Sequence, residues 1–153
     1  MAALKYAPMG HRSIGPTPQL GARPLGRAET AEVLNASTLV AVMLESPQAI
    51  DNAEVIAAVN GIDVLMIGTS DLTAEMGIPG ELDGAPVVKA YERLIAACAR
   101  HGKWPGMGGI YDEPLMGRYI GMGVRFILSG ADQSFLAAGA KARSGFLRML
   151  ESA

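Results

Sequence analysis

Short apolar runs alternate along this chain with longer segments whose apolar positions recur at the period of a helix. The runs predict buried β-strands at residues 39–44, 64–67, 104–107 and 125–128. The segments between and after them predict helices at residues 48–59, 86–100, 113–122 and 133–150, with a shorter helix at 28–35. Strands that alternate with helices predict a parallel sheet with right-handed crossovers.

The number of strand–helix units indicates the fold class. Four βα units with short loops suit a (β/α)8 barrel of the TIM type, but a whole barrel needs eight units and about 250 residues. The chain has 153 residues, so it holds half of such a barrel, and we expect one domain over residues 1–153. Residues 1–26 are rich in Pro and Gly and predict an irregular lead-in. The alternative fold is a small doubly wound sheet.

Composition excludes several function classes. The formal net charge is −2, so nothing points to nucleic acid or to an anionic membrane surface. No apolar run reaches the length of a membrane span, and no signal-peptide pattern is present. The single cysteine, Cys98, rules out an internal disulfide, and we expect a cytoplasmic protein. No G-x-G-x-x-G follows a strand, so a dinucleotide site is unsupported.

Two carboxylates follow neighbouring strands, at the point where each strand ends. Glu45 comes after the first apolar run and Asp71 after the second. Consecutive strands of a parallel sheet end on the same face, which is where α/β folds place their chemistry. Two hard oxygen ligands there suit a divalent cation such as Mg or Mn. The alternative interpretation is that both carboxylates only cap the helices that follow.

The residues around Asp71 add groups that suit an anionic substrate. Gly68 lets the backbone come close to a ligand. The successive N–H groups from Gly68 through Thr69 and Ser70 to Asp71 suit a carboxylate. Arg12 lies in a loop framed by Gly and Pro, where it is interpreted either as a substrate contact or as a loop anchor.

Four motifs resemble the HpcH/HpaI aldolase/citrate lyase family, the metal-dependent class II 2-oxo-acid aldolases. They are P-M-G-H-R-S-I-G at 8–15, L-E-S at 44–46, G-T-S-D-L-T-A-E-M-G at 68–77 and G-V-R-F-I-L-S-G-A-D at 123–132. The resemblance covers nearly all of this chain, but only the C-terminal half of the family's barrel, roughly strands five to eight. It therefore implies that this chain is the C-terminal half of a (β/α)8 barrel.

The resemblance implies a divalent metal (Mg, Mn or Co) held by Glu45 and Asp71. It implies that pyruvate, or the pyruvyl part of a longer 2-oxo or 4-hydroxy-2-oxo acid, chelates the metal, with backbone donors at Ser70 and Asp71. The implied reaction is aldol cleavage or addition with an aldehyde acceptor, through a metal-bound enolate. The family's catalytic Arg and His lie on earlier strands, outside this sequence, so no catalytic residue is assigned. A Gln is common two positions before the metal Glu, where this chain has Met43.

Two other functions remain open. One is a non-catalytic or partial half-barrel that binds metal and oxo acid or acts in assembly. The other is a lyase of the citryl- or malyl-coenzyme-A type, although T-S-D-L-T at 69–73 and the short Pro79-Gly80 loop favour the aldolase.

The predicted half-barrel also has consequences for assembly. It exposes two sheet edges, at residues 39–44 and 125–128, and we expect association with a copy of the chain or with a separate N-terminal half. The final predicted helix is rich in large apolar residues, and in the family such a helix often packs on a neighbouring subunit.

Overall fold

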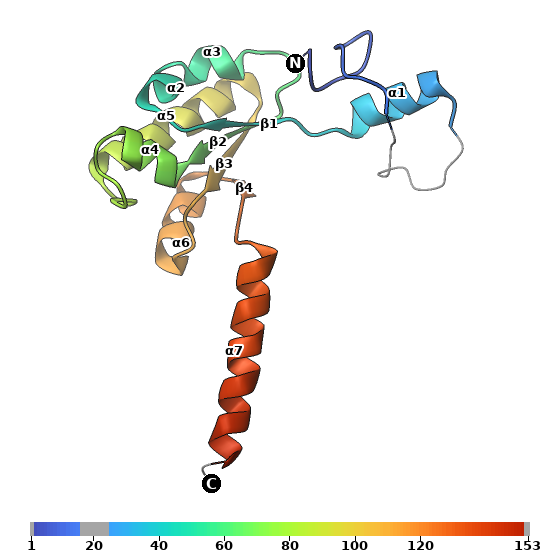
Figure 1. Ribbon diagram of the computed structural model, residues 1–153. Coiled ribbons are helices and arrows are strands. Elements are labelled where there is room, and N and C mark those ends of the chain that lie inside the picture. Colours follow the sequence, from blue (N-terminus) through green and yellow to red (C-terminus); the bar gives the residue numbers. More distant parts are fainter. Residues whose placement is uncertain (1, 16–24, 152–153) are drawn as a thin grey trace.

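The core of the protein is a four-stranded parallel sheet with strands in the order β1-β2-β3-β4 (Figure 1). A computed structural model describes residues 2–15 and 25–151. The strands are β1 Ala41–Leu44, β2 Val64–Gly68, β3 Trp104–Gly108 and β4 Phe126–Ile127. All four lie within two residues of their predicted places, and the parallel α/β prediction is confirmed.

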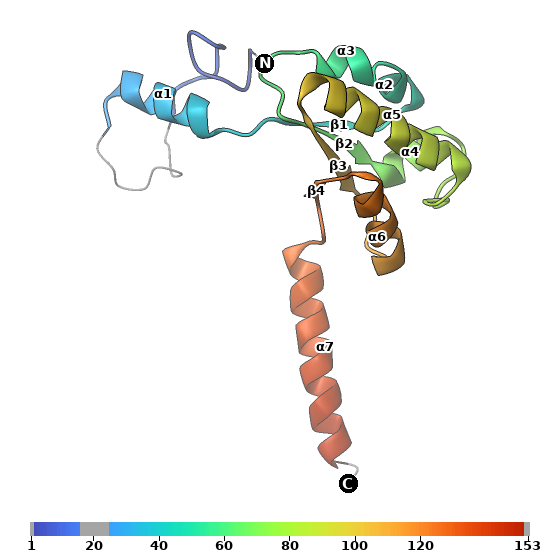
Figure 2. The same cartoon turned by 180° about the vertical axis from the view of Figure 1, so that it is seen from behind.

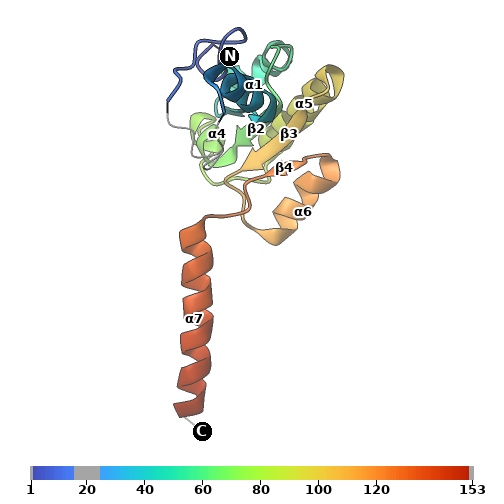
Figure 3. The same ribbon diagram turned by 90° about the vertical axis from the view of Figure 1, so that its right-hand side faces the viewer.

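Seven helices are described, and four of them cover one face of the sheet. They are α1 Arg27–Ser37, α2 Pro47–Asp51, α3 Ala53–Ala57, α4 Thr69–Glu75, α5 Ala85–His101, α6 Glu113–Met122 and α7 Asp132–Glu151. Helices α2, α3, α5 and α6 lie on the same side of the strands (Figures 1 and 3). The longest of these, α5, contacts both β2 and β3 and packs beside α3 and α6.

Strand register explains where the core forms. Leu44 pairs with Ile67, Ile67 with Met107, and Met107 with Ile127, so one row of apolar side chains crosses the sheet. Because side chains alternate along a strand, this whole row faces the helix layer. Leu44, Ile67 and Met107 are at most 1% exposed there. The burial of this row fixes the register of the strands.

The other face of the sheet carries the neighbouring row, Met43, Met66, Gly106 and Phe126. Met43 is 44% exposed and Trp104, at the start of β3, is 59% exposed. None of the described helices covers this face as α5 covers the opposite one (Figure 3). Within the described residues β1 and β4 are the edge strands, so this sheet has two open edges and an apolar second face.

Two predictions about helices were wrong in detail. The helix expected at 48–59 is divided at Asn52 into α2 and α3. Asn52 leaves helical geometry, with φ −94° and ψ 8°, while its side-chain amide donates to the Gln48 carbonyl at 2.8 Å. The segment after β2, expected to be a loop, begins with the short helix α4.

The two ends of the chain extend away from the sheet. Helix α7 points away from the strands in both views, and none of its described residues is buried (Figures 1 and 2). Residues 2–15 carry no helix or strand, as predicted for the lead-in, whereas residues 1 and 16–24 lie outside the described residues. No helix in the described ranges is both long and apolar enough to cross a membrane.

Candidate functional site

Glu45 and Asp71 lie at the carboxyl ends of neighbouring parallel strands. Glu45 directly follows β1, and Asp71 occupies the first turn of α4, which begins directly after β2. Leu44 pairs with Ile67, so Glu45 comes opposite Gly68. A Cβ placed on Gly68 would lie 2.8 Å from both Cγ and Oε1 of Glu45. The Glu45 carboxylate therefore rests against the backbone three residues before Asp71.

Both carboxylates are available to a ligand. Glu45 and Asp71 are exposed, and no ion pair or side-chain hydrogen bond engages either carboxylate within residues 2–15 and 25–151. Carboxylate oxygens with free lone pairs are the donors that hard divalent cations prefer. Among the described residues no group of three or more His, Cys, Asp or Glu could hold a metal. The donor set therefore fits a cation that keeps water or substrate oxygens as its other ligands.

The backbone approaches closely around Ser70. A Cβ on Gly109, in the loop after β3, would lie 2.8 Å from Ser70 Oγ and 3.1 Å from Ser70 N. Gly109 also has a φ of +81°, which favours glycine. Glu45, after β1, therefore lies against Gly68 at the end of β2, and Ser70, after β2, lies against Gly109 just after β3.

Of the predicted substrate residues, four lie together at the end of β2 and the start of α4, and Arg12 does not. Gly68 is the last residue of β2, and Ser70 and Asp71 lie in the first turn of α4, which follows directly. The Thr69 side chain is fully buried, and its hydroxyl lies 2.7 Å from the hydroxyl of Tyr91. Only the backbone of Thr69 is therefore placed to meet a ligand.

Arg12 is held in another part of the molecule. Its guanidinium lies over the ring of Tyr6, 5.2 Å from the centroid. The Tyr6 amide donates to the side-chain oxygen of Asn35 at 2.7 Å, and the Lys5 ammonium donates to the Asn35 and Thr38 carbonyls. These contacts tie the N-terminal segment to the end of α1, before β1 begins. The structure does not bring Arg12 to the carboxyl ends of the strands.

Two more residues contribute to the site, Met43 and Tyr91, and the sequence pattern indicated only Met43. Met43 Sδ lies 3.0 Å from the Cβ position of Gly68, so a thioether sits beside the Glu45 carboxylate. Tyr91 supports the turn from within the helix layer. In the sequence Tyr91 is one apolar position of a helix, and no local signal marks its partner.

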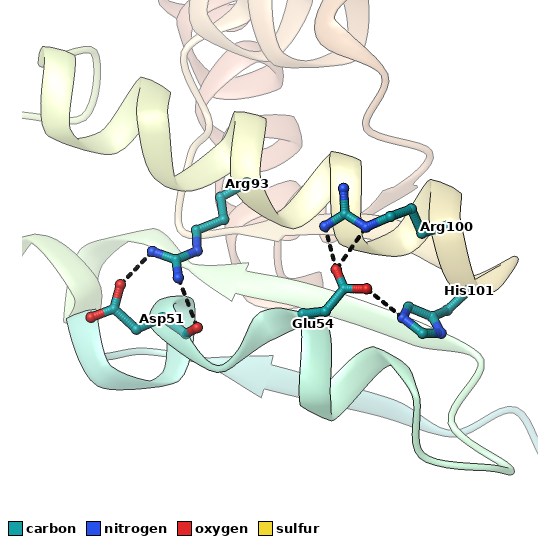
Figure 4. A network of polar contacts seen from close by, with 5 residues as sticks. All are labelled: Asp51, Glu54, Arg93, Arg100 and His101. Atoms are coloured by element: carbon teal, nitrogen blue, oxygen red, sulfur yellow. Dashed lines mark hydrogen bonds and ion pairs between the residues drawn. The ribbon is translucent and has the colours of Figure 1, made fainter.

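A separate group of charged side chains lies outside the site, between the short helices and α5 (Figure 4). Asp51 pairs with Arg93, and Glu54 pairs with both Arg100 and His101. Hydrogen bonds from Arg100 and His101 lower the pKa of Glu54 from 4.5 to about 2. These carboxylates are engaged with cations, unlike Glu45 and Asp71, so the group is interpreted as a clamp between helices.

Comparison with known proteins gives consistent matches along the chain. A family model described as HpcH/HpaI aldolase/citrate lyase matches residues 1–136. A 4-hydroxy-4-methyl-2-oxoglutarate aldolase of Chaetomium globosum is 39% identical over 140 residues, which are 89% of this chain and 52% of that protein. A 4-hydroxy-2-oxo-heptane-1,7-dioate aldolase of Salmonella paratyphi C is 34% identical over 142 residues, covering 93% and 54%.

A solved structure shows the same arrangement of elements. The crystal structure of an HpcH/HpaI aldolase from Desulfitobacterium hafniense DCB-2 superposes with a TM-score of 0.78 at 27% identity, over 95% of this chain and 56% of that one. The chain therefore spans about half the length of the curated relatives and of the solved structure that it matches.

Proposed function

This chain belongs to the HpcH/HpaI aldolase/citrate lyase family, and from that premise we propose that it provides the metal-binding part of a divalent-metal-dependent 2-oxo-acid aldolase. The substrate class is pyruvate, or a longer 2-oxo or 4-hydroxy-2-oxo acid, with an aldehyde as the second reactant. The observation that carries the proposal is the placement of two carboxylates, Glu45 and Asp71, at adjacent strand ends, with the Glu45 carboxylate against Gly68 and neither ion-paired to a described residue.

Each group at the strand ends has a role in this proposal. Glu45 and Asp71 hold Mg, Mn or Co, which when bound supplies a Lewis acid that polarises the keto oxygen and stabilises the charge developing there. The backbone N–H groups of Ser70 and Asp71 donate to the carboxylate of the oxo acid. Gly68 leaves room for the oxo acid to approach the strand ends, because a side chain on Gly68 would meet Glu45.

In the part of the chain that the structure describes, the strand ends do not offer every group that carbon–carbon bond cleavage needs. Among the described residues the nearest strand ends supply carboxylates, hydroxyls and backbone donors, whereas Arg12 lies over Tyr6, in the segment that is tied to the end of α1. We therefore propose that the sheet is the C-terminal half of a (β/α)8 barrel, completed by a further half-barrel or by a second copy. The open edges β1 and β4 and the apolar face around Met43 and Trp104 support this.

Exchange of the methyl protons of pyruvate tests the chemistry separately from bond cleavage. In D2O with the diamagnetic ion Mg²⁺, we expect the chain to exchange these protons faster than Mg²⁺ alone, as followed by proton NMR. Glu45→Gln and Asp71→Asn should remove the excess, because each removes a proposed metal ligand. Glu75→Gln, at the exposed end of α4, is the matched control and should exchange like the wild type.

The outcome also separates the two alternatives that the sequence leaves open. Metal binding without any excess exchange would favour a partial half-barrel that binds but does not catalyse. Exchange of acyl-coenzyme-A methyl protons in preference to those of pyruvate would favour a citryl- or malyl-coenzyme-A type lyase. Exchange that is equal in the wild type and in both carboxylate variants would contradict the proposed site.

A further inference from the structure

The turn that carries Ser70 and Asp71 is held from behind by a buried hydroxyl pair. Thr69 Oγ1 lies 2.7 Å from the hydroxyl of Tyr91, and both side chains are fully buried. Thr69 is the first residue of α4, whereas Tyr91 lies in the middle of α5. The bond therefore joins the first turn of α4 to the helix layer, from the side opposite the exposed Asp71.

Tyr91 is itself fixed by its neighbours. Its ring stacks on the ring of Tyr119 in α6, with centroids 4.1 Å apart and an interplanar angle of 30°. The Tyr119 hydroxyl in turn donates to the Leu82 carbonyl at 2.6 Å, in the loop between α4 and α5. The stacking of two rings with no exposed surface leaves the Tyr91 hydroxyl little freedom, and this stacking does not depend on the Tyr119 hydroxyl. The position of Thr69 is thus set by a rigid partner.

A second threonine holds the same turn independently. Thr73 is fully buried, and its hydroxyl donates to the Ser70 carbonyl at 2.9 Å. The same hydroxyl accepts from the Gly80 amide at 3.3 Å. Ser70 and Asp71 are therefore framed by Thr69 and Thr73, whose hydroxyls both point into the protein. Of the two threonines, only Thr69 forms a hydrogen bond with a side chain of a different helix.

We propose that Tyr91 is a positioning residue for the candidate metal site, acting through Thr69 to hold the turn that presents Ser70 and Asp71. The inference rests on the proposed function, because it assigns Asp71 as a metal ligand. Its physical basis is that a carboxylate binds a metal well only when the backbone that carries it is already in place. Burial also raises the pKa of the Tyr91 phenol above its ordinary value, so the hydroxyl stays protonated at any physiological pH.

Titration of the full chain with MnCl2 tests this inference. Tyr91→Phe and Thr69→Val should each weaken Mn²⁺ binding about tenfold, whereas Thr69→Ser keeps the hydroxyl and should bind like the wild type. The double variant should lose no more than either single variant, because both changes break one bond. Losses that multiply in the double variant would overturn the inference, since the two residues would then act separately.

Tyr119→Phe is the matched control for general destabilisation. It removes a buried tyrosine hydroxyl from the same stacked pair, but that hydroxyl bonds the Leu82 carbonyl and not the turn. It should lower the thermal unfolding midpoint about as much as Tyr91→Phe and leave Mn²⁺ affinity unchanged. Equal losses of affinity in the two variants would show a merely structural role and overturn the inference.

Amide hydrogen exchange keeps the two proposals distinguishable. The helical bonds of residues 73–75 end on carbonyls of the first turn of α4, so their exchange reports whether that turn is held. If the wild type binds no Mn²⁺, the proposed function fails, and exchange alone decides the role of Tyr91. Faster exchange at residues 73–75 in Tyr91→Phe but not in Tyr119→Phe supports that role, and equal exchange in both contradicts it.

Discussion

Because Gly68 has no side chain, the Glu45 carboxylate can lie against the backbone at this position. A Cβ there would lie 2.8 Å from Glu45 Cγ and Oε1 and 3.0 Å from Met43 Sδ. These distances are shorter than ordinary contacts between such atoms, so one of the two flexible side chains would have to move. Gly68 therefore matters for the place of the carboxylate rather than for backbone conformation.

Replacement of Gly68 by alanine should weaken metal binding without unfolding the protein. The new methyl group would push the Glu45 carboxylate away from the strand end, and we expect Mn²⁺ affinity to fall by about tenfold. Titration with MnCl2 measures this loss. The matched control is Gly117→Ala on α6, where nothing lies within 4 Å of the new Cβ. That change should leave affinity unchanged and raise stability by up to about 1 kcal/mol. Unaltered affinity in Gly68→Ala would contradict the placement of Glu45.

At the residue scale the sequence predicted the positions of the two carboxylates but not every neighbour. Glu45 and Asp71 follow apolar runs, and strand direction alone puts both at the carboxyl ends of the strands of a parallel sheet. Thr69 and Ser70 were predicted to offer backbone N–H groups to a ligand, and the sequence does not show which of their side chains faces inward. Which of them faces inward depends on Tyr91, 22 residues further along, and no local pattern contains that information.

Between elements, the most extensive polar contact joins the short helices after β1 to α5 (Figure 4). Glu54 on α3 accepts from Arg100 Nε at 2.8 Å and pairs with His101 Nε2 at 2.7 Å. Asp51 on α2 forms an ion pair with Arg93, which lies about two helical turns before Arg100 on α5. Because α2 and α3 have five residues each, they are too short to be stable alone, and these contacts hold them on α5.

The contribution of this clamp should depend on pH. The pKa of Glu54 is lowered from 4.5 to about 2 in the folded protein, so its carboxylate stabilises the fold above pH 4.5 and the stabilisation is lost as the pH falls toward 2. Thermal unfolding midpoints of the wild type and Glu54→Gln should therefore differ most near neutral pH and converge below about pH 3. High salt should also shrink the difference, because the group is exposed.

Glu92→Gln is the control for that comparison. Glu92 is an exposed carboxylate of α5 that forms no ion pair with the described residues. Its midpoint should follow that of the wild type at each pH. A constant difference between Glu54→Gln and the wild type from pH 7 to about pH 2 would contradict an ionic origin of the clamp.

At the element scale the long periodic segments were predicted well, whereas the short helix α4 and the break between α2 and α3 were not. The helices expected at 86–100 and 113–122 appear as Ala85–His101 and Glu113–Met122. Helix α4 has seven residues, too few to show a helical period, and it was expected to be a loop. The break at Asn52 depends on a side-chain bond to the Gln48 carbonyl, which competes with the helix and leaves the apolar pattern intact.

For the molecule as a whole, the sequence predicted the parallel sheet but not the position of the C-terminal helix α7, which extends away from it. The apolar positions of α7 repeat as in an amphipathic helix, yet the helix has no buried residue in this chain. Its exposed large apolar residues are Phe135, Leu136, Phe146, Leu147, Met149 and Leu150. An amphipathic pattern shows that a helix face needs a partner, whereas the identity of that partner is a property of the assembly.

The chain should therefore associate in solution. Its open sheet edges and the apolar residues of α7 favour pairing with a copy of itself when no other half-barrel is present. Size-exclusion chromatography with light scattering at micromolar concentration should give a mass of at least twice 15.9 kDa. Leu147→Lys should shift the population toward the monomer, and Lys141→Ala, on the same helix, should not. A well-folded monomer would contradict the half-barrel proposal and favour a closed small α/β fold.

Mn²⁺ titration of the purified chain tests most directly whether the two strand-end carboxylates form one metal site. Isothermal calorimetry of the wild type should show a single class of Mn²⁺ site. Glu45→Gln and Asp71→Asn should each remove measurable binding, because one remaining carboxylate leaves too few protein ligands. Glu75→Gln should bind as the wild type does, although it changes the net charge equally. Equal Mn²⁺ affinity in all four proteins would contradict the site.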